Sequence, residues 1–320
     1  MCVIVAIAVI GGWCYEAAAD DVLKEADLSL SAGYRVDKLD WNIAGNIYGQ
    51  NPNILSELKW DDLEIYQTKA KGQLVLGSPR FTYFDALFRG AVSYGWIDDG
   101  ENQDSDFKGD NRTLEYSRSY SSTEGDNVFD IDVGVGPRFT IGSGILKITP
   151  LGGYSYHKQN LNMTNGVQVV SRFDLDPHLA APGPITGLDS TYEAKWHGPW
   201  VGVDLEVAPC RNLIVKGSFE YHWADYEAEA NWNLRTDLAN PVSFEHDADG
   251  DGIVVAAAVT YDFWQHWAVE ISGDYQDWQT DPGLSRTYVV SPTPGVGITR
   301  LNEVNWQSYS LMLGITYRFL

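Results

Sequence analysis

Hydrophobic and polar residues alternate with a period of two in segment after segment of the chain. One such segment covers residues 213–223, and others cover residues 129–138, 201–207 and 267–276. In residues 213–223, one face carries Leu213, Val215, Gly217, Phe219, Tyr221 and Trp223, and the other carries Lys216, Ser218, Glu220 and His222. Because successive side chains of a β-strand point to opposite faces, this period predicts strands that separate an apolar environment from a polar one.

Two details favour a membrane barrel over a soluble sandwich, which would alternate in the same way. The polar faces carry charges in mid-strand, where a sandwich would place its core, and Trp and Tyr stand at the ends of the apolar faces. The final segment places Tyr309, Leu311, Leu313, Ile315, Tyr317 and Phe319 on one face. This strand resembles the aromatic C-terminal signal that the outer-membrane assembly machinery recognises, although Leu320 follows Phe319.

We therefore predict an all-β chain that forms a ten-stranded antiparallel up-and-down transmembrane β-barrel in a bacterial-type outer membrane. Residues 142–144 and 208–212 are predicted periplasmic turns, and the polar stretches 98–112, 165–190, 234–250 and 278–302 are predicted cell-surface loops. Such a barrel has a narrow lumen. We expect paired charges to fill it, contributed by Asp85, Arg89, Lys216, Glu220, Glu270 and Arg318.

The composition agrees with a barrel and excludes a helical membrane protein. The 320 residues are 44% hydrophobic and 13% aromatic, with a mean hydropathy of -0.24. The one continuous apolar run, Cys2–Trp13, is shorter than the roughly 20 residues of a spanning helix. It reads as a signal peptide over residues 1–19, with cleavage after Ala19, although no Lys or Arg precedes it. Residues 20–320 are then a single barrel domain.

The charge balance restricts the partners of the protein. The net charge of -22 argues against nucleic acid, because phosphate binding needs a basic surface. An acidic surface attracts cations or cationic peptides, although solvated loops alone would also account for it. Cys210 is the only cysteine beyond the leader, so no internal disulfide is expected in residues 20–320.

Several segments resemble one known family in order and spacing. Residues 55–60, with the pattern Ser-x-Leu-x-Trp, are followed along the chain by residues 151–158, 192–202 and 217–221. Together they resemble strands two, five, six and seven of the omptins, which are ten-stranded outer-membrane proteases. The resemblance covers most of residues 20–320 at low identity.

The resemblance implies a catalytic site that this chain carries only in part. Omptins cleave peptides with an Asp pair and an Asp-x-His dyad, which activate a water molecule. The pair carries over to Asp104 and Asp106, but Asn231 and Asn233 stand where the dyad belongs. Asn has no proton equilibrium near neutral pH, so it cannot act as the general base. A displaced histidine, namely His178, His222 or His246, is the alternative source of a base.

Other residues are candidates for binding. Glu229 lies near the acid with which omptins receive a basic side chain, and Tyr154 and Lys158 match two positions that bind lipopolysaccharide in the family. Asp247, Asp249 and Asp251 spell the start of a calcium loop, but Ala258 stands where an EF-hand needs Glu. A hairpin tip rich in turn-forming residues explains the same spelling. Lipopolysaccharide, calcium and cationic peptides are thus the ligands to test.

Three functions stay open at this level. The first is an omptin-like barrel without family-type proteolysis, which has a surface-binding or structural role. The second is an active omptin-type aspartic endopeptidase that cleaves at basic residues with a displaced histidine. The third is a small channel for cations or polar solutes, which the expected luminal charges disfavour.

Overall fold

The chain forms one closed β-barrel in a computed structural model that describes residues 22–78, 81–142 and 144–320. The predicted signal peptide, residues 1–19, lies outside the described residues. The strands, as the structure describes them, are β1 (Leu23–Ile43), β2 (Ser56–Ser78), β3 (Phe81–Gly109), β4 (Thr113–Ser122), β5 (Asn127–Ile141), β6 (Leu146–Ser171), β7 (Gly183–Pro184), β8 (Asp189–Cys210), β9 (Leu213–Asn231), β10 (Phe244–Trp264), β11 (Trp267–Thr280), β12 (Gly283–Val289) and β13 (Gly295–Arg318). No helix long and apolar enough to cross a membrane occurs among these residues.

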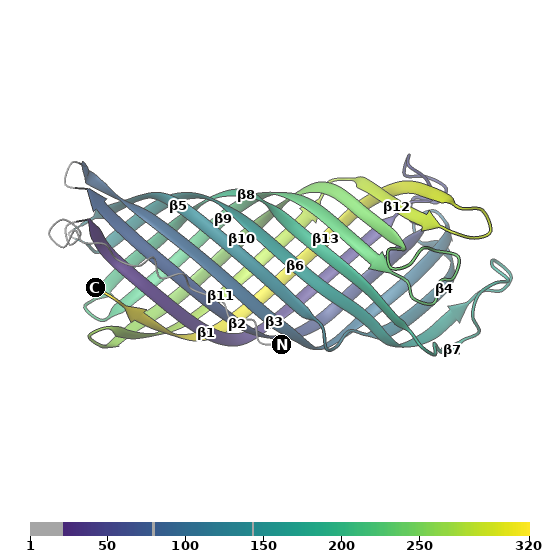
Figure 1. Cartoon of the computed structure of the whole chain (residues 1–320), viewed down its shortest axis with the longest axis horizontal. Coiled ribbons are helices and arrows are strands. Elements are labelled where there is room, and N and C mark those ends of the chain that lie inside the picture. Colours follow the sequence, from purple (N-terminus) through teal and green to yellow (C-terminus); the bar gives the residue numbers. More distant parts are fainter. Residues whose placement is uncertain (1–21, 79–80, 143) are drawn as a thin grey trace.

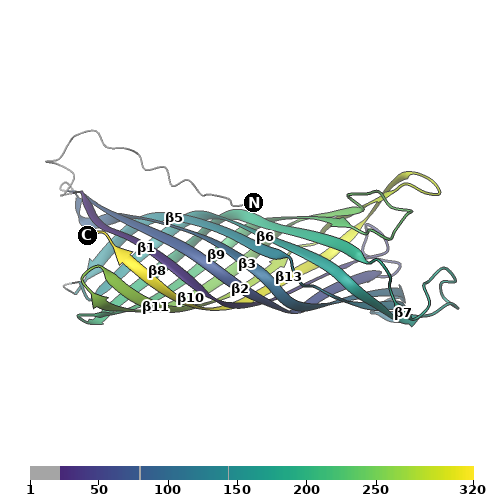
Figure 2. The same ribbon diagram turned by 60° about the horizontal axis from the view of Figure 1, so that its bottom comes forward.

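Antiparallel pairing runs round a ring of ten strand positions, which confirms the predicted fold. The ring closes between β1 and β13, with Asp27 opposite Arg318 at one end and Ile43 opposite Leu301 at the other. Two positions are each shared by two strands, because β4 and β5 both pair with β3 and β6, and β11 and β12 both pair with β10 and β13. Figures 1 and 2 show the result as a long tube of steeply tilted strands.

The two ends of the tube differ. Short connections and the C-terminus lie at one end, called here the turn end, and β4, β7 and β12 lie at the other, called the loop end (Figure 1). At the turn end, β8 and β9 are separated by residues 211–212 alone. The longest connections, residues 44–55, 172–182 and 232–243, belong to the loop end.

The outer wall next to the turn end faces lipid. Its outward side chains are apolar and open, for example Leu311 at 65% and Leu313 at 64% exposure. Aromatic residues border this band on both sides, with Trp264 and Trp267 towards the turn end and Tyr34, Tyr66 and Trp96 towards the loop end. A continuous apolar belt with aromatic girdles matches a bilayer. We call this part the membrane zone and the remainder, towards the loop end, the distal zone.

The strands continue through the distal zone, which corrects the predicted loops. Residues 98–109 belong to β3, residues 165–171 to β6, residues 244–250 to β10, and most of residues 278–302 to β11, β12 and β13. Sequence patterning missed them because above the bilayer the outer face is polar too, so the apolar–polar contrast fades. Of the predicted turns, Gly142 and Gly144 lie in the connection between β5 and β6, and Ser143 is outside the described residues. In the other, residues 211–212 form the turn, whereas residues 208–210 still belong to β8.

The interior changes character between the zones. In the distal zone it is a packed apolar core, whose largest members are Trp41, Trp60, Trp196, Tyr192, Tyr226, Trp278 and Trp306. In the membrane zone it is lined by charges, which pair as predicted: Lys24 with Asp85, Arg89 with Glu220, Lys216 with Glu270, and Arg318 with Asp262. Next to the turn end, the barrel is therefore apolar on its outer face and charged inside. Towards the loop end, its outer face is polar and its interior is apolar.

Candidate functional site

Asp104 and Asp106 lie on β3 in the distal zone, not in a loop, and point inward. They stand opposite Leu58 and Ser56 of β2, and Leu58 belongs to the core. Burial raises the pKa of Asp106 to about 6, against the stabilising effect of the hydroxyls of Ser56 and Ser117 and the charge of Arg235. Burial and the neighbouring Asp106 raise the pKa of Asp104 well above its usual value. When two carboxyl groups share one apolar site, ionisation of one raises the free-energy cost of ionising the other. Such a pair therefore holds one proton between them over a wide pH range.

Asn231 and Asn233, which the resemblance to omptins sets at the dyad positions, lie at the end of β9 and just beyond it. Asn233 Oδ1 accepts hydrogen bonds from the Asp189 backbone N–H and the Ser190 hydroxyl, both at 3.0 Å, and its Nδ2 donates to the Gly187 carbonyl. Asn233 thus fastens the start of β8 to the end of β9. Asn231 ends β9, and its Oδ1 is buried without a hydrogen-bond partner among the described residues.

Arg235 lies in the connection between β9 and β10, residues 232–243, close enough for its charge to act on the acid pair. Its charge acts on both Asp104 and Asp106, while its guanidinium donates two hydrogen bonds, of 2.8 and 2.7 Å, to Asp237. A cation beside the pair favours the ionised carboxylates but cannot accept a proton from a water molecule. Sequence analysis missed Arg235, although it stands two residues after the second dyad position.

The three histidines considered as a replacement base lie in different surroundings. His178 is exposed in the connection after β6. His222 faces the lumen of the membrane zone, where its ring contacts the Ser155 hydroxyl at 3.0 Å and Glu220 at 3.1 Å. His246 is buried in the distal core against the Tyr192 hydroxyl and the Trp41 ring, and burial lowers its pKa to about 3. None is among the groups that act on the carboxyls of Asp104 and Asp106.

Aromatic side chains fill the interior beside the acid pair. The Tyr192 ring lies between those of Trp41 and Trp60, at centroid distances of 5.9 and 5.1 Å, and its hydroxyl is 2.6 Å from that of Tyr226. Towards the membrane zone, Trp278 and Trp306 stack at 5.4 Å. These rings close the barrel between its two ends.

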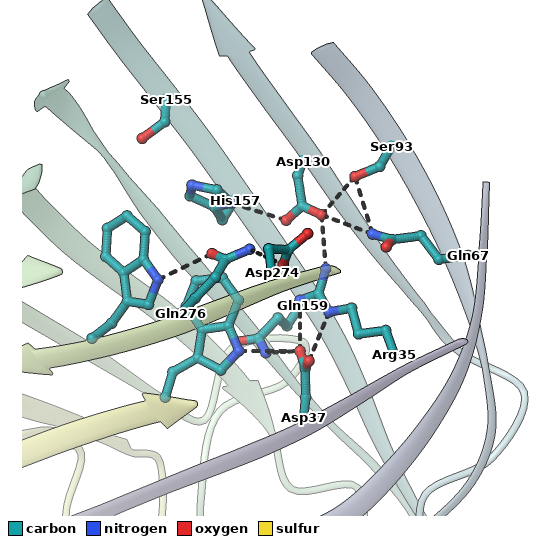
Figure 3. Close-up of polar contacts among 12 residues, drawn as sticks. Arg35, Asp37, Gln67, Ser93, Asp130, Ser155, His157, Gln159, Asp274 and Gln276 are labelled. Atoms are coloured by element: carbon teal, nitrogen blue, oxygen red, sulfur yellow. Dashed lines mark hydrogen bonds and ion pairs between the residues drawn. The ribbon is translucent and has the colours of Figure 1, made fainter. Parts of the chain in front are cut away.

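A charged network adjoins the stacked Trp pair, with the Arg35 guanidinium over the Trp306 ring. Figure 3 shows how Arg35, Asp37, Asp130 and His157 of this network lie. The Arg35 guanidinium donates two hydrogen bonds of 2.6 Å to Asp37 and one of 2.8 Å to Asp130. Asp130 also accepts from Ser93 at 2.8 Å and lies 3.0 Å from His157. The Trp306 indole N–H donates to Asp37 at 3.1 Å, so the network and the aromatic layer are joined.

Glu229 belongs to a group of acids on the outer face of the distal zone. Three pairs of acids stand directly opposite each other on β9 and β10, namely Asp225 with Asp249, Glu227 with Asp247, and Glu229 with Glu245. We call these six residues the acidic ladder. Their side chains point outward, whereas those of Asp104 and Asp106 point inward, so Glu229 and the Asp pair lie on opposite sides of the wall.

The calcium candidates are part of the same strand face. Asp247 and Asp249 belong to the acidic ladder, and Asp251 continues it opposite Trp223. All three lie within β10, where alternate side chains are spread along an extended strand and do not converge as in a loop. The described residues hold no group of three or more His, Cys, Asp or Glu side chains placed to bind a metal ion. Calcium binding here stays a prediction without structural support.

The lipid candidates lie on the outer wall of β6. Tyr154 is half-exposed, with its hydroxyl 3.2 Å from the His197 ring, and the Lys158 ammonium lies 2.6 Å from Glu193. Lys195 stands opposite Lys158 on β8 and contacts the same Glu193 at 2.7 Å. Both lysines lie further towards the loop end than Tyr154, on the same outer face.

The fold and this pattern of surfaces define an outer-membrane β-barrel. The chain belongs to a family described as Pom, the Protochlamydia outer membrane protein, whose model matches residues 29–319. Among curated proteins, no significant match to the chain was found.

One solved structure with a similar fold is also an outer-membrane protein. The outer membrane protease OmpT from Escherichia coli has a TM-score of 0.69 at 12% identity, over 92% of this chain and 97% of that one. The outer membrane protein OprG from Pseudomonas aeruginosa has a TM-score of 0.35 at 12% identity, over 92% and 97% of the two chains. The similarity to OmpT is one of fold, and it supports the omptin-like architecture expected from the sequence.

Proposed function

We propose that this barrel is a surface-binding protein that captures cationic partners on its acidic ladder and does not perform omptin-type proteolysis. The observation that carries the proposal is the register of β9 and β10, which sets three acids directly against three others on an outward face. Directly opposed like charges destabilise a sheet. A bound cationic group would offset this repulsion, so the ladder gains most when a partner covers it.

The basic residues around the ladder leave most of its charge free. Arg286 pairs with Asp247, and Lys195 stands opposite Glu227 at the edge. The Tyr288 hydroxyl donates to Glu245 at 2.5 Å. Two cations beside six carboxylates leave a patch that attracts Lys- and Arg-rich peptides by long-range steering.

The site geometry supports the absence of proteolysis. Asn231 and Asn233 cannot serve as a general base, Arg235 occupies the side of the acid pair, and the aromatic core fills the space beside it. In this proposal the loop end faces the cell exterior, as in the orientation predicted from the short and long connections.

A lipid partner is proposed for the outer face of β6 and β8, which adjoin the acidic ladder. Lys158 and Lys195 extend from the outer wall immediately above exposed Tyr154, at the level where phosphate groups of lipopolysaccharide meet the barrel. Their shared partner Glu193 holds both ammonium groups in place, and a phosphate would compete for them.

The test uses the mature barrel, residues 20–320, refolded with lipopolysaccharide and mixed with a fluorogenic peptide that carries paired basic residues. We expect binding, seen as increased anisotropy and weakened by salt, but no cleavage. The double variant Glu227→Gln/Asp247→Asn should weaken binding about 10-fold, equivalent to about 1.4 kcal/mol.

The matched control removes two exposed acids from another wall, Glu64→Gln/Asp98→Asn, and should bind nearly as well as the wild type. If both double variants lost the same amount of peptide affinity, the binding would depend on the overall negative charge and not on the ladder. That result would overturn the proposed site. Cleavage that disappears in Asp104→Ala would show instead that the barrel is an active endopeptidase.

A further inference from the structure

The lumen of the membrane zone contains two adjoining cavities, with volumes of about 100 Å³ and 130 Å³. The cavity nearer the aromatic layer is lined by Arg35, Asp130 and His157 of the charged network, and the other reaches Arg138 and Lys147 towards the turn end. Lys69, Lys71 and Arg89 line both. The two cavities therefore form one polar chamber under the Trp278–Trp306 stack.

The chamber is unevenly charged. Among the described residues, four basic and four acidic side chains line the cavity under the aromatic layer, whereas six basic and four acidic side chains line the cavity nearer the turn end. This local excess of positive charge lies inside a chain whose net charge is -22. In a space of low dielectric, such an excess attracts an anion more strongly than it would in water.

Lys71 is the centre of this excess. It has no ion pair or hydrogen bond among the described residues, and two other lysines of the chamber have long ion pairs. Lys69 lies 3.5 Å from Asp274, and Lys216 lies 3.7 Å from Glu270. Lys216 projects from β9, on the other side of the ring from β2, and its charge acts directly on Lys71. Two ammonium groups thus converge from opposite walls on one cavity.

Arg89 adds a donor to the same space. Its guanidinium contacts Glu220, Asp204 and Asp132, while its Nε–H is buried without a hydrogen-bond partner among the described residues. Its three acids face the chamber as well, and they favour the cavity nearer the turn end, away from Asp132 and Glu220, as the place for an anion.

Among the described residues, the aromatic core closes the lumen towards the loop end. Towards the turn end the lumen is crossed by ion-paired side chains, with Glu25 joined to Arg138 at 2.6 Å and to Lys147 at 2.9 Å. The Glu25 side chain is 36% exposed, so this ion-paired layer borders solvent. Exchange of these pairs would admit a small solute without any movement of the strands.

We propose that the turn-end cavity binds a small soluble oxyanion, of the phosphate or carboxylate class, between Lys71 and Lys216. The first test is titration calorimetry of the refolded mature barrel with inorganic phosphate. Binding should be saturable, and Lys71→Gln should weaken it about 10-fold. Lys38→Gln, which removes an exposed lysine of the outer wall paired with Asp61, should leave it unchanged.

A second measurement separates a site from a loss of folding. Ser218 lines both cavities, so Ser218→Cys in a Cys210→Ser background places one thiol in the chamber. An anionic methanethiosulfonate reagent should modify this thiol faster than a cationic one, and phosphate should slow the reaction. Adding Lys71→Gln should remove both effects while heat-modifiable gel mobility shows an intact barrel. Absence of phosphate binding, equal affinity of Lys71→Gln and Lys38→Gln, or faster reaction with the cationic reagent would each overturn the proposal.

Discussion

Single side chains of the candidate site were predictable in type but not in surroundings. Asp104 and Asp106 stand out in the sequence as an acid pair, yet their inward direction follows from pairing with β2, about fifty residues away. His246 could be named as a candidate base, but its burial depends on Trp41 of β1 and Tyr192 of β8. Such contacts depend on which strands are neighbours in the ring, and no local pattern contains that information.

His246 gives the barrel a specific acid sensitivity. Burial lowers its pKa to about 3, below the ordinary value of 6.5, so the unfolded chain binds this proton first as the pH falls. Stability from the neutral ring is complete above about pH 6.5 and is lost as the pH falls towards 3. Between pH 7 and pH 4 the loss amounts to as much as about 3 kcal/mol.

Replacement His246→Phe keeps an aromatic ring and removes this titration. We expect the free energy of unfolding in urea to fall less between pH 7 and pH 4 in His246→Phe than in the wild type. The raised pKa values of Asp104 and Asp106 act in the opposite direction in the same window, and they cancel when the two proteins are compared. Identical pH profiles would contradict a buried neutral His246.

Strand existence was predictable at the level of elements, whereas strand length was not. In the membrane zone, side chains that face lipid are apolar and those that face the lumen are polar, so the two kinds alternate along each strand, as in residues 213–223. In residues 98–109 the inward positions include Gly100, Asn102, Asp104 and Asp106, and only the partner strand supplies Leu58 and Trp60. Acids at every second position in residues 225–229 and 245–251 were a usable sign of two adjacent outward faces.

The register between β10 and β11 sets the position of Trp278 in the aromatic layer, and a substitution at Gly252 tests this position. Gly252 stands opposite Trp278, and a Cβ added there would collide with the indole ring. Gly252→Ala must therefore displace Trp278, at an expected cost of roughly 1–3 kcal/mol in the free energy of unfolding.

Gly217→Ala is the matched control on the neighbouring strand β9. Its added Cβ would meet only the Ala256 carbonyl, at 3.9 Å, so the variant should be as stable as the wild type. Urea unfolding followed by Trp fluorescence compares the two. Equal stability of both variants would mean that the indole of Trp278 does not lie against Gly252.

At the scale of the whole molecule, the closure separates this barrel from an open pore. The Arg35–Asp37–Asp130 network, the stacked Trp278 and Trp306, and the rest of the distal core lie in series along the lumen. A hydrated ion would have to pass all three, and the packed rings would remove its water shell and replace little of it. We therefore expect no steady conductance from the wild-type barrel in planar lipid bilayers.

The same arrangement predicts which change opens the lumen. Trp278→Ala/Trp306→Ala removes the stacked layer above the charged chamber and takes away the two rings against which Trp196 of the distal core packs, so the core loosens and intermittent openings should appear. Trp223→Ala removes an indole of the same size from the outer wall, where it is 50% exposed, and should stay silent. Steady conductance in the wild type would show that the lumen is a channel and that the aromatic core is not a fixed barrier. Silence of the double variant would instead assign the barrier to the layers that remain, namely the Arg35–Asp37–Asp130 network and the rest of the distal core.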